Sequence, residues 1–182
     1  MLEQDFISFL RVYKHDFLNH LQVIQGYLQL QKPEQALRYL KEAMKDVELY
    51  GSVLRLKLPA VAFWLLLKEL ELRKQGITMH LCSDTPFSVS AALEKSLLAF
   101  LKGIVGDIAR RLGRLPFEDR EWNLSFVGQD ELRIVFALPG EEIIDWAPLF
   151  QDRLDLISDF NVVMHGSNYE GKFNCQLELS VS

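Results

Sequence analysis

Cysteine is scarce in this chain, and only Cys82 and Cys175 occur among its 182 residues. Two cysteines so far apart exclude a disulfide-rich scaffold and a cysteine-based zinc site. Long hydrophobic runs are missing as well. The longest, LPAVAFWLLL at 58–67, is stopped by Lys68 and is too short to cross a bilayer. Two free thiols and no spanning segment are typical of a protein in a reducing compartment.

Positive charge is also limited, with 20 Lys and Arg residues against 25 acidic ones and a net charge of −5. Nucleic-acid binding would require a clustered basic surface, which this balance does not offer. The first residues, MLEQDFISFLRVYK, carry acids where a secretory signal needs positive charge. We therefore expect a cytoplasmic protein that binds neither nucleic acid nor membrane.

Two long helices are predicted at the start of the chain, over residues 2–31 and 34–55. Pro33 and Glu34 suit the first turn of the second helix, and the short turn before it predicts an antiparallel hairpin, a domain of residues 1–55. In the first helix, apolar residues recur in steps of three and four, which is the spacing of one helix face. This apolar stripe consists of Phe6, Leu10, Tyr13, Phe17, Leu21, Ile24 and Leu28.

The apolar surface of the first helix is wider than one partner helix can cover. Five further residues extend the stripe to about half of the circumference at ~100° per residue. They are Phe9, Val12, Val23, Tyr27 and Leu30. The uncovered part predicts a second hairpin, most simply from another copy, which would make a homodimeric four-helix bundle. In the alternative arrangement, the C-terminal half of the same chain covers it.

Residues 56–182 have a different pattern and form the second predicted domain, with the boundary expected between 52 and 58. Helices are predicted at 59–75, 88–113 and 147–158. Strands are predicted at 77–83, 121–128, 131–138, 160–166 and 172–181, where apolar and polar residues alternate. Helices and strands in this order predict the α+β class, an α/β sandwich with one helical layer on a mostly antiparallel sheet.

His15 lies in the middle of the polar face of the first helix, about 160° from the centre of the apolar stripe. Asn19 and Arg11 are one turn away on either side, so both side chains can reach the imidazole. Asp16 can bond one ring nitrogen and leave the other free to attack phosphorus. The spacing also fits an ordinary surface histidine. His20, on the apolar side, fits a core or interface residue better than a metal ligand.

The segment KHDFLNHLQVIQGYLQLQKPEQALRYL resembles the histidine-bearing hairpin of the sporulation initiation phosphotransferase B family and of the related citrate- and malate-type sensor histidine kinases. The shared motif is H-D-[FW]-x-N-x-L-Q. Its fixed positions are filled by His15, Asp16, Phe17, Asn19, Leu21 and Gln22. The resemblance implies that His15 is phosphorylated, that the hairpin dimerises, and that the second domain resembles the ATPase domain of a histidine kinase.

The second domain departs from the nucleotide site of such kinases in three places. Gly103 and Asp107 stand where the kinases have the two asparagines of an N-L-x-x-N-A box, and Leu138 stands where an acid reads adenine. The segment WAPLFQDRLDLISDF, at 146–160, contains no glycine and replaces a glycine-rich lid. Without these phosphate and Mg²⁺ contacts, ATP affinity should be very low. We expect a degenerate domain with no cofactor or metal of its own.

The resemblance therefore implies a histidine phosphotransferase of a bacterial phosphorelay, independent of ATP. His15 would carry the phosphoryl group between the aspartates of two response regulators, with Asp16 and Asn19 assisting. Docking residues are expected at Arg11, Leu18 and Gln22, and Mg²⁺ is expected to come with the regulator. Two alternatives stay open, a diverged sensor kinase core that uses ATP through Asp107 and a non-enzymatic protein that docks regulators.

Overall fold

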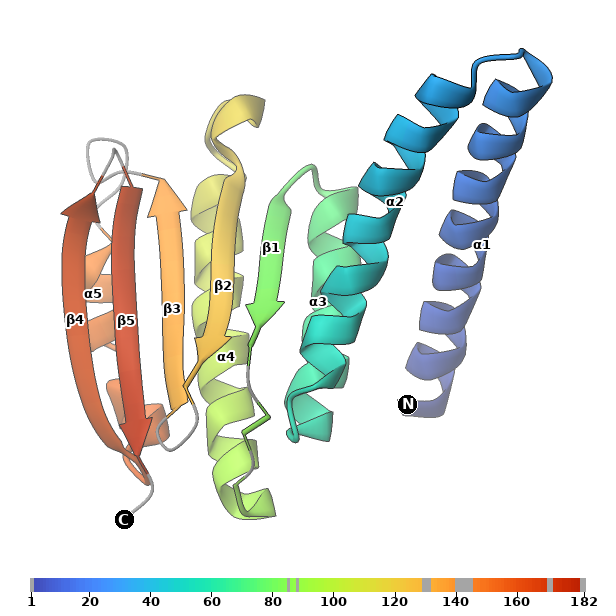
Figure 1. The fold of residues 1–182 in the computed structure, drawn as a ribbon. Helices are drawn as coiled ribbons and strands as arrows, with labels where there is room; N and C mark the ends of the chain where they lie inside the picture. Colours follow the sequence, from blue (N-terminus) through green and yellow to red (C-terminus); the bar gives the residue numbers. More distant parts are fainter. Residues whose placement is uncertain are drawn as a thin grey trace. The chain divides into compact units, whose positions relative to one another are not determined.

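The computed structural model describes residues 2–84, 86–87, 89–128, 132–139, 146–169 and 172–180, and Figure 1 shows its helices and strands. The chain divides into two compact units, Met1–Gly51 and Ser52–Ser182. Among the described residues, none of the helices combines the length and the apolar character that crossing a bilayer requires.

The first unit consists of α1, Leu2–Gln29, and most of α2, Pro33–Leu54, which form an antiparallel hairpin (Figure 1). The turn follows from the end of α1. Gln31 adopts a left-handed conformation with φ of 57°, its N–H bonds the Leu28 carbonyl, and the Lys32 N–H bonds the Tyr27 carbonyl. This is a Schellman ending with glutamine in the position that glycine usually fills. Pro33 then begins α2, as its fixed φ favours.

The second unit contains a five-stranded sheet in the order β1-β2-β3-β5-β4. The strands are β1 Thr78–Ser83, β2 Glu121–Val127, β3 Leu132–Pro139, β4 Asn161–Tyr169 and β5 Lys172–Ser180. Only the β1–β2 pair is parallel among these pairings, and the others are antiparallel. The helices are α3 Pro59–Lys74, α4 Ala91–Leu112 and α5 Ala147–Gln151, with short 3-10 turns at Phe117–Asp119 and Leu154–Ile157. The predicted α+β class is confirmed.

One face of the sheet is covered by helices, which Figure 1 shows behind the strands. Alternate residues of β2, β3 and β5 are buried, as expected for a sheet with one packed face. The buried members include Trp122, Leu124, Phe126, Ile134, Phe136, Cys175 and Leu177. Helix α3 packs against α4 and β1. The carboxylate of Glu94 in α4 accepts the N–H groups of Ala60 and Val61 at 2.8 and 3.2 Å, which caps the start of α3.

Several predicted elements differ in their bounds from the observed ones. The helix predicted from residue 88 begins at Ala91, because the Ser90 hydroxyl accepts the Leu93 N–H at 3.3 Å and acts as its N-cap; Ser88 lies outside the described residues. The helix predicted over 147–158 is instead α5 followed by the turn Leu154–Ile157, because the chain leaves helical geometry after Gln151. Strand β4 continues three residues beyond its predicted end.

Candidate functional site

His15 lies in the middle of α1, and its side chain is 73% exposed. Its Nδ1 atom is 3.2 Å from Oδ1 of Asp16 and 3.2 Å from Nδ2 of Asn19. These two contacts bring together His15, Asp16 and Asn19, the three residues that are expected to take part in phosphoryl transfer. Both contacts are made to the same ring nitrogen, so the other nitrogen, Nε2, makes neither of them.

The two contacts on Nδ1 require different protonation patterns of the imidazole. When Nδ1 carries the proton it donates to Asp16, and Nε2 then holds a free lone pair. When Asn19 donates its amide hydrogen to Nδ1, that nitrogen must be unprotonated, and Nε2 carries the proton of the neutral ring. Asp16 therefore favours the tautomer whose Nε2 is a nucleophile, which is the reason such a pair suits phosphoryl transfer.

The three predicted docking residues, Arg11, Leu18 and Gln22, are all exposed on α1. Leu18 is 43% exposed although it is apolar. Among the described residues, Arg11 makes no hydrogen bond to the imidazole of His15. The structure therefore places Asp16 and Asn19 in contact with His15 and leaves the docking residues around it on the surface of the same helix.

His20 lies at the contact between α1 and α2. Its Nδ1 is 3.0 Å from the Tyr39 hydroxyl, and the two rings are 5.7 Å apart. Tyr27 also contacts Tyr39, with ring centroids 6.3 Å apart. On the helical wheel, these contacts lie about 130° away from His15 at 100° per residue. His15 thus faces away from the partner helix of its own hairpin.

Much of the predicted apolar stripe of α1 stays exposed in this hairpin. Five of its members are exposed by between 44% for Leu10 and 56% for Leu28, the others being Phe6, Phe17 and Leu21. Helix α2 adds exposed apolar residues of its own, which include Leu37, Leu40, Met44 and Val47. The exposed stripe of α1 lies about 80° from its contacts with α2. This is the arrangement of a helix that has one neighbour in place and lacks a second.

A second cluster of charged residues lies in the other unit, around Asp107 of α4. The carboxylate is buried. Its Oδ2 accepts the Nε–H of Arg153 at 2.8 Å and a second hydrogen bond from Nη2 of the same guanidinium, while Oδ1 accepts from Nη1 of Arg110 at 2.7 Å. Burial by itself raises the pKa of Asp107, but the hydrogen bonds and charges of Arg153 and then Arg110 hold it below its ordinary value of 3.8.

Gly103, one turn before Asp107, makes room for the same arginine. A Cβ atom at position 103 would lie 2.6 Å from Nη1 of Arg153, so a side chain there would require this guanidinium to shift. Both positions that the resemblance aligns with the kinase asparagines are therefore occupied by one internal cation. The sequence analysis missed Arg153, because no local pattern links it to a residue 46 positions earlier.

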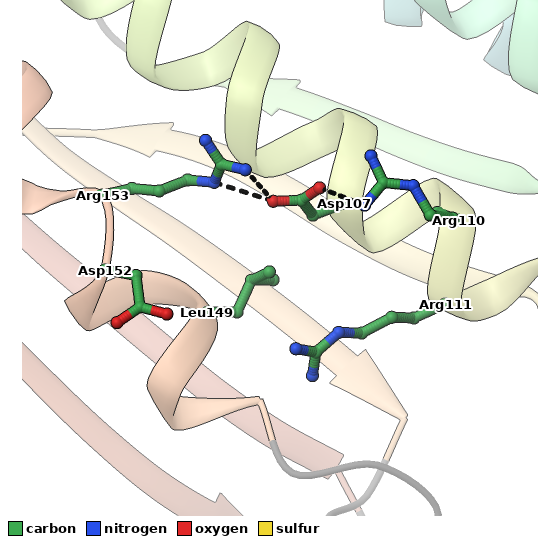
Figure 2. A pocket seen from close by; sticks show the side chains of 6 residues that line it. All are labelled: Asp107, Arg110, Arg111, Leu149, Asp152 and Arg153. Atoms are coloured by element: carbon green, nitrogen blue, oxygen red, sulfur yellow. Dashed lines mark hydrogen bonds and ion pairs between the residues drawn. The ribbon is translucent and has the colours of Figure 1, made fainter.

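Asp107 and its two arginine partners line a pocket of about 370 Å³ (Figure 2). Figure 2 shows Asp107, Arg110 and Arg111 extending from α4, whereas Leu149, Asp152 and Arg153 come from α5 and the turn after it. Within the described ranges, no group of three or more His, Cys, Asp or Glu side chains is arranged to hold a metal ion.

Comparison with known proteins places the hairpin in a family. The family model of the alpha-helical domain of SpoOB-type sensor kinases matches residues 2–56. No curated protein gives a significant match to this chain.

Three solved structures resemble the chain at low sequence identity. The histidine kinase AdeS of Acinetobacter baumannii is 13% identical with a TM-score of 0.49, over 92% of this chain and 98% of that one. The catalytic domain of histidine kinase ThkA is 14% identical with a TM-score of 0.44, over 63% and 84%. The cytoplasmic segment of histidine kinase QseC is 10% identical with a TM-score of 0.39, over 62% and 66%. The family match covers the helical hairpin, which is similar to the alpha-helical domain of SpoOB-type sensor kinases.

Proposed function

We propose that this protein is a histidine phosphotransferase of a two-component phosphorelay, which carries a phosphoryl group on Nε2 of His15. The observation that carries the proposal is an exposed imidazole whose Nδ1 lies 3.2 Å from the Asp16 carboxylate. A family of sensor-kinase hairpins supports the same chemistry at this helix. Phosphoryl transfer needs mainly positioning and charge neutralisation, which one exposed side chain and its neighbours can supply.

The proposed step moves the phosphoryl group from a regulator's aspartyl phosphate to the ring. The lone pair of Nε2 attacks phosphorus in line, the P–N bond forms, and the P–O bond to the aspartate breaks, releasing a carboxylate. The Nδ1 proton stays on the ring, so the phosphorylated imidazole is cationic and the Asp16 carboxylate stabilises it. In the second transfer, an aspartate of another regulator attacks phosphorus and Nε2 leaves with its lone pair. Mg²⁺ would come from the regulator's acidic pocket.

A second copy of this chain is the proposed partner for the exposed apolar face of the hairpin. The exposed members of α1 and α2 would pack into the core of a four-helix bundle, with α1 gaining its second neighbour. His15 lies on the opposite side of α1 and would stay accessible to a regulator. Arg11, Leu18 and Gln22 surround it and are the proposed docking residues.

ATP is not the proposed phosphoryl source. Both oxygens of Asp107 already accept hydrogen bonds from Arg153 and Arg110, so a nucleotide-bound Mg²⁺ would have to compete with two guanidinium groups for this carboxylate. The family model nevertheless describes sensor kinases. A test of the phosphotransferase must therefore include ATP as a competing donor.

The test is a transfer assay with the whole chain and two separate donors. Receiver domains charged with ³²P-acetyl phosphate and, in parallel, γ-³²P-ATP with Mg²⁺ are incubated with wild type, His15→Gln and His165→Gln. His165 is an exposed histidine on β4, so its replacement is a matched loss of one imidazole. We expect acid-labile, alkali-stable label on wild type and His165→Gln from the receiver only, and none on His15→Gln. Label on His15→Gln would refute the assignment, and label from ATP would identify a kinase instead.

A further inference from the structure

We propose that the pocket between α4 and the α5 segment binds a small multivalent anion, bearing phosphate or carboxylate groups, without any metal ion. Six residues line it, Asp107, Arg110, Arg111, Leu149, Asp152 and Arg153. Three arginines and two aspartates leave the lining with one net positive charge. The volume of about 370 Å³ lies at the lower end of the range for small-molecule sites.

Neutralisation of Asp107 by two guanidinium groups sets the preference for anions. A carboxylate in a pocket would ordinarily attract a cation, but this one is buried and already accepts from two guanidinium groups. A metal ion would have to displace Arg153 from the space that Gly103 provides for it. The carboxylate instead acts as a fixed anchor that holds two arginines at the pocket wall.

The anchored arginines retain donors for a ligand. Each guanidinium has five N–H groups. Arg153 donates the Nε–H and one Nη2–H to Asp107, and Arg110 donates one Nη1–H. Guanidinium groups match phosphate and carboxylate oxygens in pairs, with greater geometric specificity than an ammonium group. Their fixed orientation reduces the entropy that a ligand would otherwise lose in ordering them.

Arg111 contributes a further cation from the last turn of α4. Its guanidinium carbon lies 5.8 Å from the centroid of the Trp146 ring, so the aromatic face supports it. Figure 2 shows Arg111 and Arg153 reaching the pocket from different elements, with Leu149 between them. Two cationic groups on separate walls suit a ligand with two anionic groups better than a single monoanion.

Asp152 is the lining carboxylate whose charge opposes an anion, because, unlike Asp107, it forms no ion pair with the arginines among the lining residues that the structure describes. Its carboxylate should weaken binding, so Asp152→Asn should tighten it. This opposite sign is useful, because a loss of folding or of general surface charge would not improve affinity. The site is independent of His15, so its failure would leave the phosphotransferase proposal untouched.

The test uses pyrophosphate and citrate as probes, each titrated into the full chain in EDTA by calorimetry. The indole N–H resonance of Trp146, assigned with Trp146→Phe, gives a site-specific readout, because this group donates to the Pro139 carbonyl at 2.8 Å beside the pocket. We expect saturable binding of at least one probe, weakened about tenfold by Arg111→Gln and tightened by Asp152→Asn. Comparing the two probes distinguishes a phosphate ligand from a carboxylate one.

Arg114→Gln is the matched control, because Arg114 is an exposed arginine just beyond α4 and outside the pocket. It should leave the affinity unchanged. Equal losses in Arg111→Gln and Arg114→Gln would mean non-specific attraction and would overturn the proposal. So would the absence of saturable binding by both probes, or binding that requires added Mg²⁺. Arg153→Gln is used as a further test only if its circular dichroism spectrum matches that of wild type. If it does not match, the proposal is judged on Arg111→Gln.

Discussion

Replacing Leu21 with glutamate should convert the proposed dimer into single chains. Leu21 lies on the exposed apolar stripe of α1 and is 47% exposed in the hairpin. Full burial of a leucine side chain is worth about 1.5–3 kcal/mol, so the exposed half can still contribute about 0.7–1.5 kcal/mol when a second copy covers it. Four other residues of the apolar stripe of α1 are exposed to a similar extent.

The free energy of dimerisation is obtained by adding the same contribution over the exposed residues of the apolar stripe. Five side chains exposed by 44–56% in each of two copies give a gross gain of about 7–15 kcal/mol, to which the apolar residues of α2 add. Association itself costs about 4–15 kcal/mol. The net gain is therefore modest. Two glutamates in the bundle core remove two leucines and also bury two charges, each at a cost of several kcal/mol, so dimerisation should be lost at micromolar concentration.

Sedimentation velocity checks this directly, because one chain has a mass of 21.1 kDa. Wild type should sediment at twice this mass and Leu21→Glu at the single-chain mass, with unchanged helix content. Ser8→Glu is the control, since Ser8 is exposed and lies about 170° from the exposed stripe at 100° per residue. A Leu21→Glu protein that stays dimeric, or a wild type that is monomeric, would refute the reasoning.

Four further changes test other parts of the structure. Asp16→Asn should slow phosphoryl transfer to His15 by about 10–100-fold through loss of a charge-assisted bond, measured as the initial rate of labelling from a charged receiver. Gln31→Gly should raise the unfolding free energy by about 1 kcal/mol, because φ of 57° suits glycine; urea denaturation should show this gain, and no gain for Gln31→Ala. Glu94→Ala should lower the unfolding free energy by about 1–2 kcal/mol, because Ala60 and Val61 lose their acceptor, and a scanning-calorimetry melting temperature equal to wild type would contradict it. The arginines hold the pKa of Asp107 below 3.8. The charge of Asp107 therefore stabilises the fold above that pH, and this contribution is lost as the pH falls through the lowered pKa. Asp107→Asn should lower the unfolding free energy at neutral pH, and its difference from wild type should shrink in acid.

Local periodicity was sufficient to predict most helices and strands. The three-and-four spacing of α1 and the alternation in β2, β3 and β5 reflect which side of each element is packed, and this information lies within a few neighbouring residues. The α+β class followed from the order of elements. The strand order could not be predicted in the same way, because alternation does not say which strand is the neighbour. Strand β5 lies between β3 and β4, a pairing that depends on the whole sheet.

The charged cluster marks another limit of sequence reasoning. The sequence aligns Asp107 with a kinase asparagine and, in one alternative, predicts that it serves ATP binding, but it suggests no ion-pair partner for this residue. Its main partner, Arg153, follows α5 and is 46 positions away. The spacing of Gly103 and Asp107 places them one helical turn apart on the same face of α4. Only the packing of the α5 segment shows that Arg153 lies against both positions.

At the histidine site, the motif brings the Asp16 carboxylate to one particular ring nitrogen of His15. Adjacent helical residues ordinarily point in different directions, about 100° apart, yet the Asp16 carboxylate lies 3.2 Å from Nδ1 of His15. Asp16 is only 37% exposed and lies between the polar face and the side of α1 that meets α2. An acid there can reach only the ring nitrogen nearer the backbone. In the proposed mechanism, the outer nitrogen, Nε2, is therefore the one that accepts the phosphoryl group.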